Sequence, residues 1–167
     1  MALTIEELER RLRLLEDERE LRSLLSRHCF NADLGRSRAY AELYADDGAI
    51  DLGTMAADHR YRRNPVRFVG REQILFDFIT GRTHRNIEGD SQHHTTGPHV
   101  FYIEGDSATA EGYSFVLVRR PEGIEVYSAS FNRWTFQRSG GQWKIAERFA
   151  RAIGTEESWD VITRTAS

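Results

Sequence analysis

The chain has 167 residues, with 26 acidic and 23 basic side chains and a formal charge of −3. This length predicts a single domain, residues 1–167, with a core large enough to surround an internal pocket. Because basic and acidic residues are interspersed, no nucleic-acid partner is expected, and a single cysteine excludes an intrachain disulfide and a metal site made of several thiolates.

The N-terminal segment gives no sign of export or membrane insertion. Residues 1–14 are charged and helix-patterned, unlike the apolar core of a signal peptide. No apolar run approaches the roughly 20 residues that span a bilayer. We therefore expect a cytoplasmic protein with no membrane partner.

A long helix opens the chain. Thr4 and Glu7 form a capping-box pattern that predicts its start, and Gly35 predicts its end near residue 34. Between these limits apolar residues recur at helical spacing: Ile5, Leu8, Leu12, Leu15, Leu21, Leu24, Leu25 and Ala32. Residues 16–20 contain none, so residues 1–20 are expected to project as an arm.

Shorter elements follow the first helix. Helices are predicted over residues 36–44 and from Gly70 to about Gly81, and short strands over 49–52 and 66–69. The polar segments 53–65 and 82–90 are expected to be loops.

The second half of the chain has β-type sequence. Strands are predicted over residues 93–104, 107–119, 124–138 and 142–152, with a tail over 153–167. Their connections are of hairpin length, so the strands should be antiparallel. Helices first and strands later predict an α+β fold, with helices packed on one face of a curved sheet.

Two residues about 60 positions apart carry the chemical hypothesis. Asp33 ends the first predicted helix and His93 opens the first long strand. A neutral imidazole can take a proton near pH 7, and a carboxylate on its far nitrogen fixes the tautomer and stabilises the imidazolium that forms. If they meet across a pocket, His93 can act as general base and acid with Asp33 as its orienting partner.

His94 is the alternative to His93. Side chains alternate along a strand, so the two rings face opposite ways. Both registers of this strand are partly apolar, so periodicity alone does not choose between them.

Other kinds of catalytic centre are less well supported. The histidines form no compact ligand pair such as H-x-x-x-H on a helix. Cys29 lies in an apolar helical stretch, and no Gly-x-Ser-x-Gly elbow exists. We therefore expect neither a metal nor another cofactor.

Several short segments, in this order and spacing, carry a family resemblance. They are residues 24–33, 43–48, 69–74, 92–96, 104–108 and 141–148, which read LLSRHCFNAD, LYADDG, VGREQI, QHHTT, EGDSA and GQWKIAER. Across roughly residues 21–148 the chain resembles the SnoaL-like group of the nuclear transport factor 2 superfamily, in its scytalone dehydratase and bile-acid dehydratase branch. The resemblance implies a conical α+β half-barrel, in which about three helices cover a strongly bent antiparallel sheet around a pocket.

The resemblance also implies a site. The dehydratases of this group use a His–Asp dyad whose positions fall on His93 and Asp33, which favours His93 over His94. Their pocket tyrosine is replaced here by His28, which could donate a hydrogen bond to a substrate carbonyl.

Four more residues are substrate-binding candidates. A second pocket histidine of the group falls on Ser114, and a pocket asparagine falls on or near Asn132. Tyr44 would supply an apolar wall, and Arg148 would hold an anionic substrate group or make a salt bridge.

Two classes of function remain open at this stage. The first is a cofactor-independent dehydratase or isomerase that acts on a small hydrophobic cyclic metabolite. The alternative is a non-catalytic ligand-binding or assembly module, including a role like that of a dioxygenase small subunit, or a polyketide cyclase. The resemblance also implies a homo-oligomer, either a trimer or a dimer.

Overall fold

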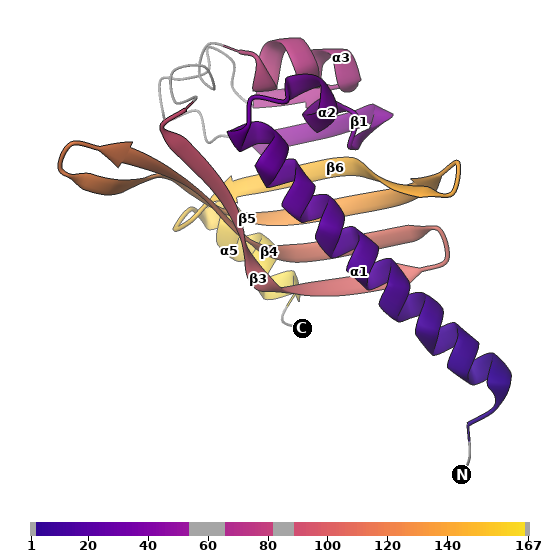
Figure 1. The fold of residues 1–167 in the computed structure, drawn as a ribbon. Helices are drawn as coiled ribbons and strands as arrows, with labels where there is room; N and C mark the ends of the chain where they lie inside the picture. The colour runs from indigo at the N-terminus through magenta and orange to yellow at the C-terminus, as the bar shows by residue number, and fades with distance from the viewer. Residues whose placement is uncertain (1–2, 54–65, 82–88, 166–167) are drawn as a thin grey trace.

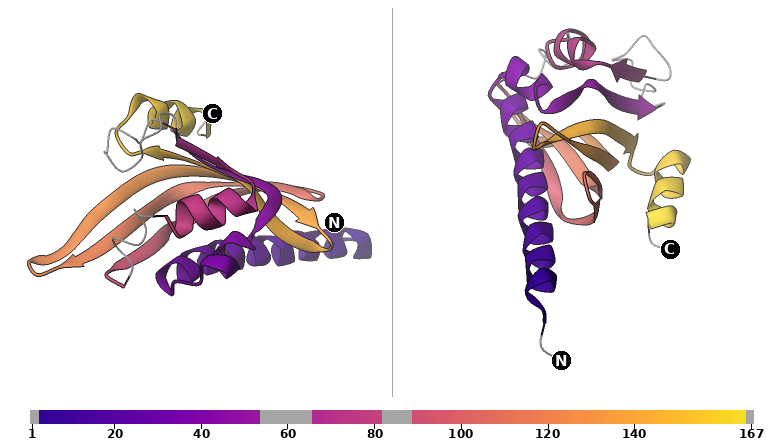
Figure 2. Two further views of the ribbon diagram at one scale, coloured as in Figure 1. Left: turned by 90° about the horizontal axis from the view of Figure 1, so that it is seen from above. Right: turned by 90° about the vertical axis from the view of Figure 1, so that its right-hand side faces the viewer.

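A curved sheet carries helices on both of its faces (Figures 1 and 2). The computed structural model describes residues 3–53, 66–81 and 89–165. The described helices are α1 (Ile5–Asp33), α2 (Ser37–Ala41), α3 (Arg71–Gln73), the π-helix η2 (Ile74–Ile79) and α5 (Glu156–Thr165). The described strands are β1 (Tyr44–Gly53), β2 (Val66–Val69), β3 (Ser91–Glu104), β4 (Ser107–Arg120), β5 (Gly123–Ser139) and β6 (Gln142–Ala152).

The described strands form one sheet in the order β2-β1-β6-β5-β4-β3. Strands β3 to β6 make the three predicted antiparallel hairpins. Outside these hairpins, one pair of strands, β1 and β6, runs parallel. These two strands are far apart in the sequence, so no hairpin sets their relative direction.

The helices are unequally divided between the faces. Helix α1 runs diagonally across one face, with α2, α3 and η2 beside its C-terminal end, and α5 lies on the opposite face (Figure 2). The main core lies between α1 and the sheet. Its largest fully buried side chains include Trp134, Tyr40, Tyr44, Leu21, Leu24, Leu25, Ile50, Ile74 and Ile145.

Local sequence signals explain both ends of α1. The Thr4 hydroxyl accepts a hydrogen bond from the Glu7 backbone N–H at 3.2 Å, which caps the first turn. At the other end Gly35 has φ of 64°, a left-handed conformation that glycine adopts without a Cβ clash. The helix therefore ends at Asp33 and leaves this carboxylate beside the sheet.

The boundaries differ most from prediction in two places. Strand β1 begins at Tyr44, so the second predicted helix is only α2. The segment expected as a tail contains α5, whose first turn is capped by a 3.2 Å hydrogen bond from the Ser158 N–H to Thr155 Oγ1. Val161 is buried, so packing against the sheet stabilises a helix too short to be stable alone.

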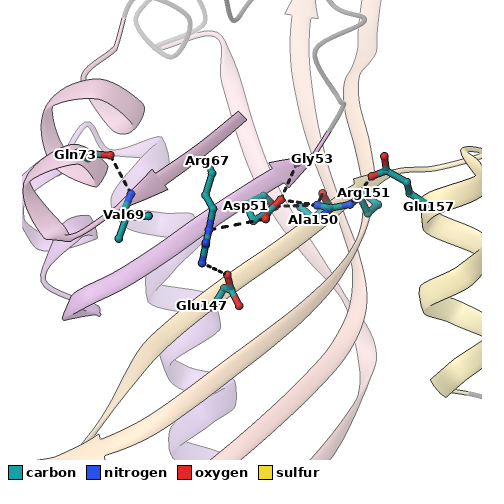
Figure 3. Close-up of polar contacts among 9 residues, drawn as sticks. All are labelled: Asp51, Gly53, Arg67, Val69, Gln73, Glu147, Ala150, Arg151 and Glu157. Atoms are coloured by element: carbon teal, nitrogen blue, oxygen red, sulfur yellow. Dashed lines mark hydrogen bonds and ion pairs between the residues drawn. The ribbon is translucent and has the colours of Figure 1, made fainter. Parts of the chain in front are cut away.

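Ion pairs fix α5 and the edge of the sheet (Figure 3). The Arg151 guanidinium on β6 contacts Asp51 on β1 at 2.8 Å and Glu157 on α5 at 2.6 Å. Arg67 on β2 reaches Glu147 on β6 at 2.7 Å. These pairs tie the parallel strand pair to its neighbours, away from the residues considered below.

No helix in the described ranges is both long and apolar enough to cross a bilayer. Most of the two predicted loops, residues 54–65 and 82–88, lies outside the described residues.

Candidate active site

Asp33 and His93 meet where the end of α1 lies against the start of β3. Nδ1 of His93 is 2.5 Å from Oδ1 of Asp33, and the backbone N–H of His93 donates to the same oxygen at 2.8 Å. The side chain of His93 is 18% exposed and that of Asp33 is 20% exposed. With its Nδ1 proton directed at the carboxylate, the neutral ring has its basic lone pair on Nε2.

Strand alternation places His94 on the other side. Its side chain is exposed, as are those of Val100 and Tyr102, while Phe101 and Ile103 pack against the core. The β3–β4 register shifts between Thr96 and Val100: these two residues are four positions apart on β3, but their partners on β4 are only two positions apart. The shift is an even number of residues, so the odd-numbered side chains stay on the core face.

Polar residues from four strands share this core face. Thr95, two positions after His93, pairs with Ser114 on β4, and Ser114 pairs with Ser130 on β5. Residues directly opposite each other in a sheet have side chains on the same face. Trp134 on β5 pairs with Arg148 on β6, so these side chains belong to the same face as His93.

The Asn132 side chain is fully buried at the centre of a hydrogen-bond network. Its Nδ2 donates to Ser114 Oγ at 2.7 Å, and its Oδ1 accepts from Nε of Arg148 at 2.9 Å. Arg148 also reaches Ser114 Oγ at 3.3 Å, and the two serine hydroxyls of the network, Ser114 and Ser130, lie 3.1 Å apart. Asn132 is therefore engaged on both ends of its amide and holds the arginine in place.

Arg148 is a cation among neutral groups. Its guanidinium carbon lies 5.0 Å from the Trp134 ring centroid, a cation–π arrangement. In residues 3–53, 66–81 and 89–165, its side chain hydrogen-bonds to Asn132 and Ser114 and also interacts with the Tyr40 hydroxyl, and no ion pair with a carboxylate accompanies these contacts. The side chain is only partly buried.

His28 lies in the aromatic core rather than beside Asp33. Its Nε2 is 3.1 Å from the Tyr44 hydroxyl, and its ring centroid lies 4.4 Å from that of Tyr40. Burial lowers the pKa of His28 well below its usual value, and the positive charge of Arg148 adds to this effect. The imidazole is therefore neutral, and its buried Nδ1 has no hydrogen-bond partner among the described side chains.

Burial also shifts the pKa values of two tyrosines. It raises the pKa of Tyr40 to about 12, although the nearby charge of Arg148 works against the rise. It raises the pKa of Tyr44 well above its usual value. Both phenols therefore stay protonated at neutral pH and can act only as neutral hydrogen-bonding groups.

The structure brings the predicted residues into three groups. Asp33 and His93 form the contact at the end of α1, while Arg148, Asn132 and Ser114 form the network on β4, β5 and β6. His28 and Tyr44 form the third group, in the aromatic core, where the positive charge of Arg148 acts on both side chains.

Sequence reasoning missed two members of this region. Ser130 stands two residues before Asn132, an alternation of polar residues within an otherwise apolar strand that points to a shared face. Tyr40 lies in a five-residue helix, where no periodic pattern is long enough to give its direction. In the described part of the chain, no three His, Cys, Asp or Glu side chains gather as a metal site would require.

These features define an NTF2-like α+β domain with a helix-covered curved sheet. The model of the SnoaL-like domain matches residues 13–149. The chain therefore belongs to the SnoaL-like family, as its sequence resemblance predicted. No protein with a curated description matches the chain significantly.

Solved structures agree on the fold. An NTF2-like protein with a cystatin-like fold from Novosphingobium aromaticivorans is 31% identical, with 95% of this chain and 97% of that chain covered and a TM-score of 0.83. A protein from Catenulispora acidiphila in complex with S-DNPA is 21% identical, with 90% and 98% covered and a TM-score of 0.64. A second Novosphingobium aromaticivorans protein, provisionally named a scytalone dehydratase, is 15% identical, with 83% and 85% covered and a TM-score of 0.64.

Proposed function

We propose that the protein is a cofactor-independent dehydratase or isomerase in which His93 moves a proton and Asp33 orients it. The observation that carries the proposal is the 2.5 Å contact between His93 Nδ1 and Asp33 Oδ1, with both side chains partly accessible. A dyad in that state has what general acid–base catalysis requires, namely an oriented base that a substrate can reach.

The chemical steps follow from this geometry. His93 Nε2 takes a proton from a carbon next to a substrate carbonyl, and the electron pair of that C–H bond forms an enolate. The imidazolium, stabilised by Asp33, then returns the proton. Delivered to a departing hydroxyl, it completes the loss of water and leaves a C=C bond. Delivered to another carbon of the enolate, it completes an isomerisation.

A family resemblance supports this class of reaction without fixing the substrate. A structure of the same fold carries the provisional name scytalone dehydratase, and another binds S-DNPA. A scaffold or assembly module would have no need of an oriented imidazole beside an accessible carboxylate, so the dyad favours the enzymatic role over the non-catalytic one.

The proposal is testable without the natural substrate. With 5-nitrobenzisoxazole, a base removes the ring C–H proton, the N–O bond breaks, and a coloured cyanophenolate forms. The wild-type protein is expected to accelerate this elimination above the rate with imidazole at equal concentration. Asp33→Asn should lose up to the whole contribution of proton transfer, about 10²–10⁴-fold.

The matched control is Asp47→Asn, which changes an exposed carboxylate on strand β1. It should react like the wild type, and thermal unfolding should show that both variants fold. A wild-type rate no higher than that with imidazole, or an Asp33→Asn rate equal to the control, would refute the proposed function.

A further inference from the structure

The interior face of the sheet holds a positive charge that the dyad mechanism does not use. Arg148 is fixed by Asn132 and Ser114 and lies over the ring of Trp134. Its side chain is partly removed from water, which is costly for a charge unless an opposite charge or strong hydrogen bonds compensate for it. The described residues around Arg148 offer only neutral groups, which favours an anionic ligand as its partner.

A second observation points to a ligand in the same region. His28 is 5% exposed, and its Nδ1 has no hydrogen-bond partner among the described residues. A buried ring nitrogen without a partner needs an explanation, and a bound molecule is one. The charge of Arg148 is felt at His28, so the two groups are near neighbours.

The distance between the Arg148 guanidinium and the His93 imidazole is one that a small molecule can span. Ser114, which accepts from Arg148, stands opposite Thr95, and Thr95 is two residues from His93. Two residues along a strand span about 7 Å. A single or fused ring can therefore reach from the guanidinium to the imidazole.

We propose that Arg148 binds a carboxylate of the substrate, so that the enzyme acts on cyclic carboxylic acids rather than on neutral hydrophobic metabolites. This inference deepens the proposed function and rests on it for the position of the reacting carbon. The guanidinium offers the forked N–H donors that match a carboxylate, while Trp134 supplies an apolar wall beside it. Asn132 is a positioning residue, because it acts through the arginine.

Binding of two matched probes tests the carboxylate site. Isothermal titration at pH 8 would compare 2-naphthoate with 2-naphthamide, which differ in charge and little in shape. The wild type should bind the acid about 10–100-fold more tightly, the range expected for charge-assisted hydrogen bonds. Arg148→Gln should abolish this preference, and Arg148→Lys should keep part of it.

Two controls separate this inference from the proposed function. Arg120→Gln changes an exposed arginine that pairs with Glu125 and should keep the full preference. His93→Ala should also keep it, since the dyad plays no part in holding the carboxylate. Equal affinities for acid and amide in the wild type, or an Arg148→Gln variant that keeps the preference, would overturn the carboxylate site whatever the result of the elimination assay.

A separate observation concerns the N-terminal part of α1. The helix extends beyond the sheet (Figures 1 and 2), and Asp17 joins it to the β5–β6 hairpin by accepting hydrogen bonds from Arg138 and Trp143. Four of the five apolar side chains of the arm, Ile5–Glu16, recur at spacings of three, four and three residues: Ile5, Leu8, Leu12 and Leu15. They are 74%, 51%, 56% and 65% exposed.

This apolar stripe has the form of a coiled-coil seam. Its spacing is that of a and d positions over nearly two heptads, and at 3.6 residues per turn it lies about half a turn around the helix from Leu21, Leu24 and Leu25, which face the sheet. The arms of two copies can therefore pack against each other while the two sheets lie on opposite sides of the paired helices. The helix is already anchored to the body, so pairing does not carry the cost of nucleating a helix.

The positions of the charged side chains favour parallel over antiparallel pairing of the two arms. In the same heptads Arg11 occupies a g position and Glu16 the following e position, so parallel arms place each Arg11 opposite the partner's Glu16. Antiparallel arms would instead place Glu9 against Glu16. We also infer that a second copy of this chain covers the stripe, forming a parallel dimer through the arms.

Sedimentation velocity tests the dimer. The wild type should be dimeric, and the double variant Leu8→Lys with Leu12→Lys should be monomeric at the same concentration. Ile124→Lys, at a position 68% exposed on the β4–β5 hairpin, should stay dimeric. A monomeric wild type, or a dimer that survives the double substitution, would exclude pairing through the arm.

A cross-link tests the direction. Leu12→Cys should form a disulfide-linked dimer on oxidation, because parallel arms in register bring position 12 next to its own copy. The native Cys29 is 5% exposed and does not compete. Cross-linking that requires Leu8→Cys in one chain and Leu12→Cys in the other would show antiparallel arms and refute the parallel arrangement.

Discussion

His93→Ala is expected to lower the rate of 5-nitrobenzisoxazole elimination by about 10²–10⁴-fold, the usual contribution of a positioned general base. One oxygen of Asp33 contacts the ring at Nδ1, at 2.5 Å, and accepts a hydrogen bond from the backbone N–H of His93 at 2.8 Å. The ring contact orients Nε2 as the proton acceptor, and alanine keeps the backbone N–H but has no ring nitrogen. The spectrophotometric assay of cyanophenolate release measures the loss directly.

The neighbouring histidine gives a matched control. His94→Ala removes the same kind of side chain one residue away, from the exposed face of β3, and should leave the rate unchanged. Folding of both variants is checked by circular dichroism. If His93→Ala stays within a few-fold of the wild type, or if His94→Ala loses as much, the assignment of the base is wrong.

Trp134→Ala is expected to destabilise the fold by about 3–5 kcal/mol, the range for truncating a buried tryptophan. The side chain is 1% exposed and lies at the centre of the interior face. Its ring meets that of His28 edge-on at 5.0 Å between centroids and lies 5.0 Å from the Arg148 guanidinium carbon. Its loss leaves a cavity and removes the apolar surface on which the arginine rests.

Urea unfolding at neutral pH measures this loss, and Trp159→Ala is the matched control. Trp159 lies on α5 and is 58% exposed, so its removal should change the free energy of unfolding by about 0.5 kcal/mol or less. A Trp134→Ala variant no less stable than the Trp159→Ala variant would contradict the central place given to this side chain.

Elements with strong local signals could be predicted closely. Strands β2 and β6 have the predicted limits, and α1 begins at the predicted capping box and ends just before Gly35. Caps, left-handed glycines and short hairpin turns act over a few residues, so the sequence around them is sufficient. Helix α5 also had such signals, in the capping Thr155 and the acidic first turn, but its amphipathic pattern is only about ten residues long.

The candidate site could be predicted less completely. The residues Asp33, His93, Asn132, Ser114 and Arg148 were all candidates, and the contact between Asp33 and His93 is present. The network that links Arg148 to Asn132 and Ser114 was not foreseen, because it requires the register of three hairpin-connected strands. The deep burial of His28 among aromatic rings was equally out of reach.

The α+β class, the long first helix, the three hairpins and the family follow from the amino-acid sequence alone, because each depends on periodicity, turn chemistry or motif order within short stretches. The interior face of β3, the parallel pairing of β1 and β6, and the shared surface of Arg148 and His93 become known only from the packed fold. Both faces of β3 are partly apolar, so its own sequence does not indicate which face will be buried. That face is set by the packing of α1, which is distant in the sequence.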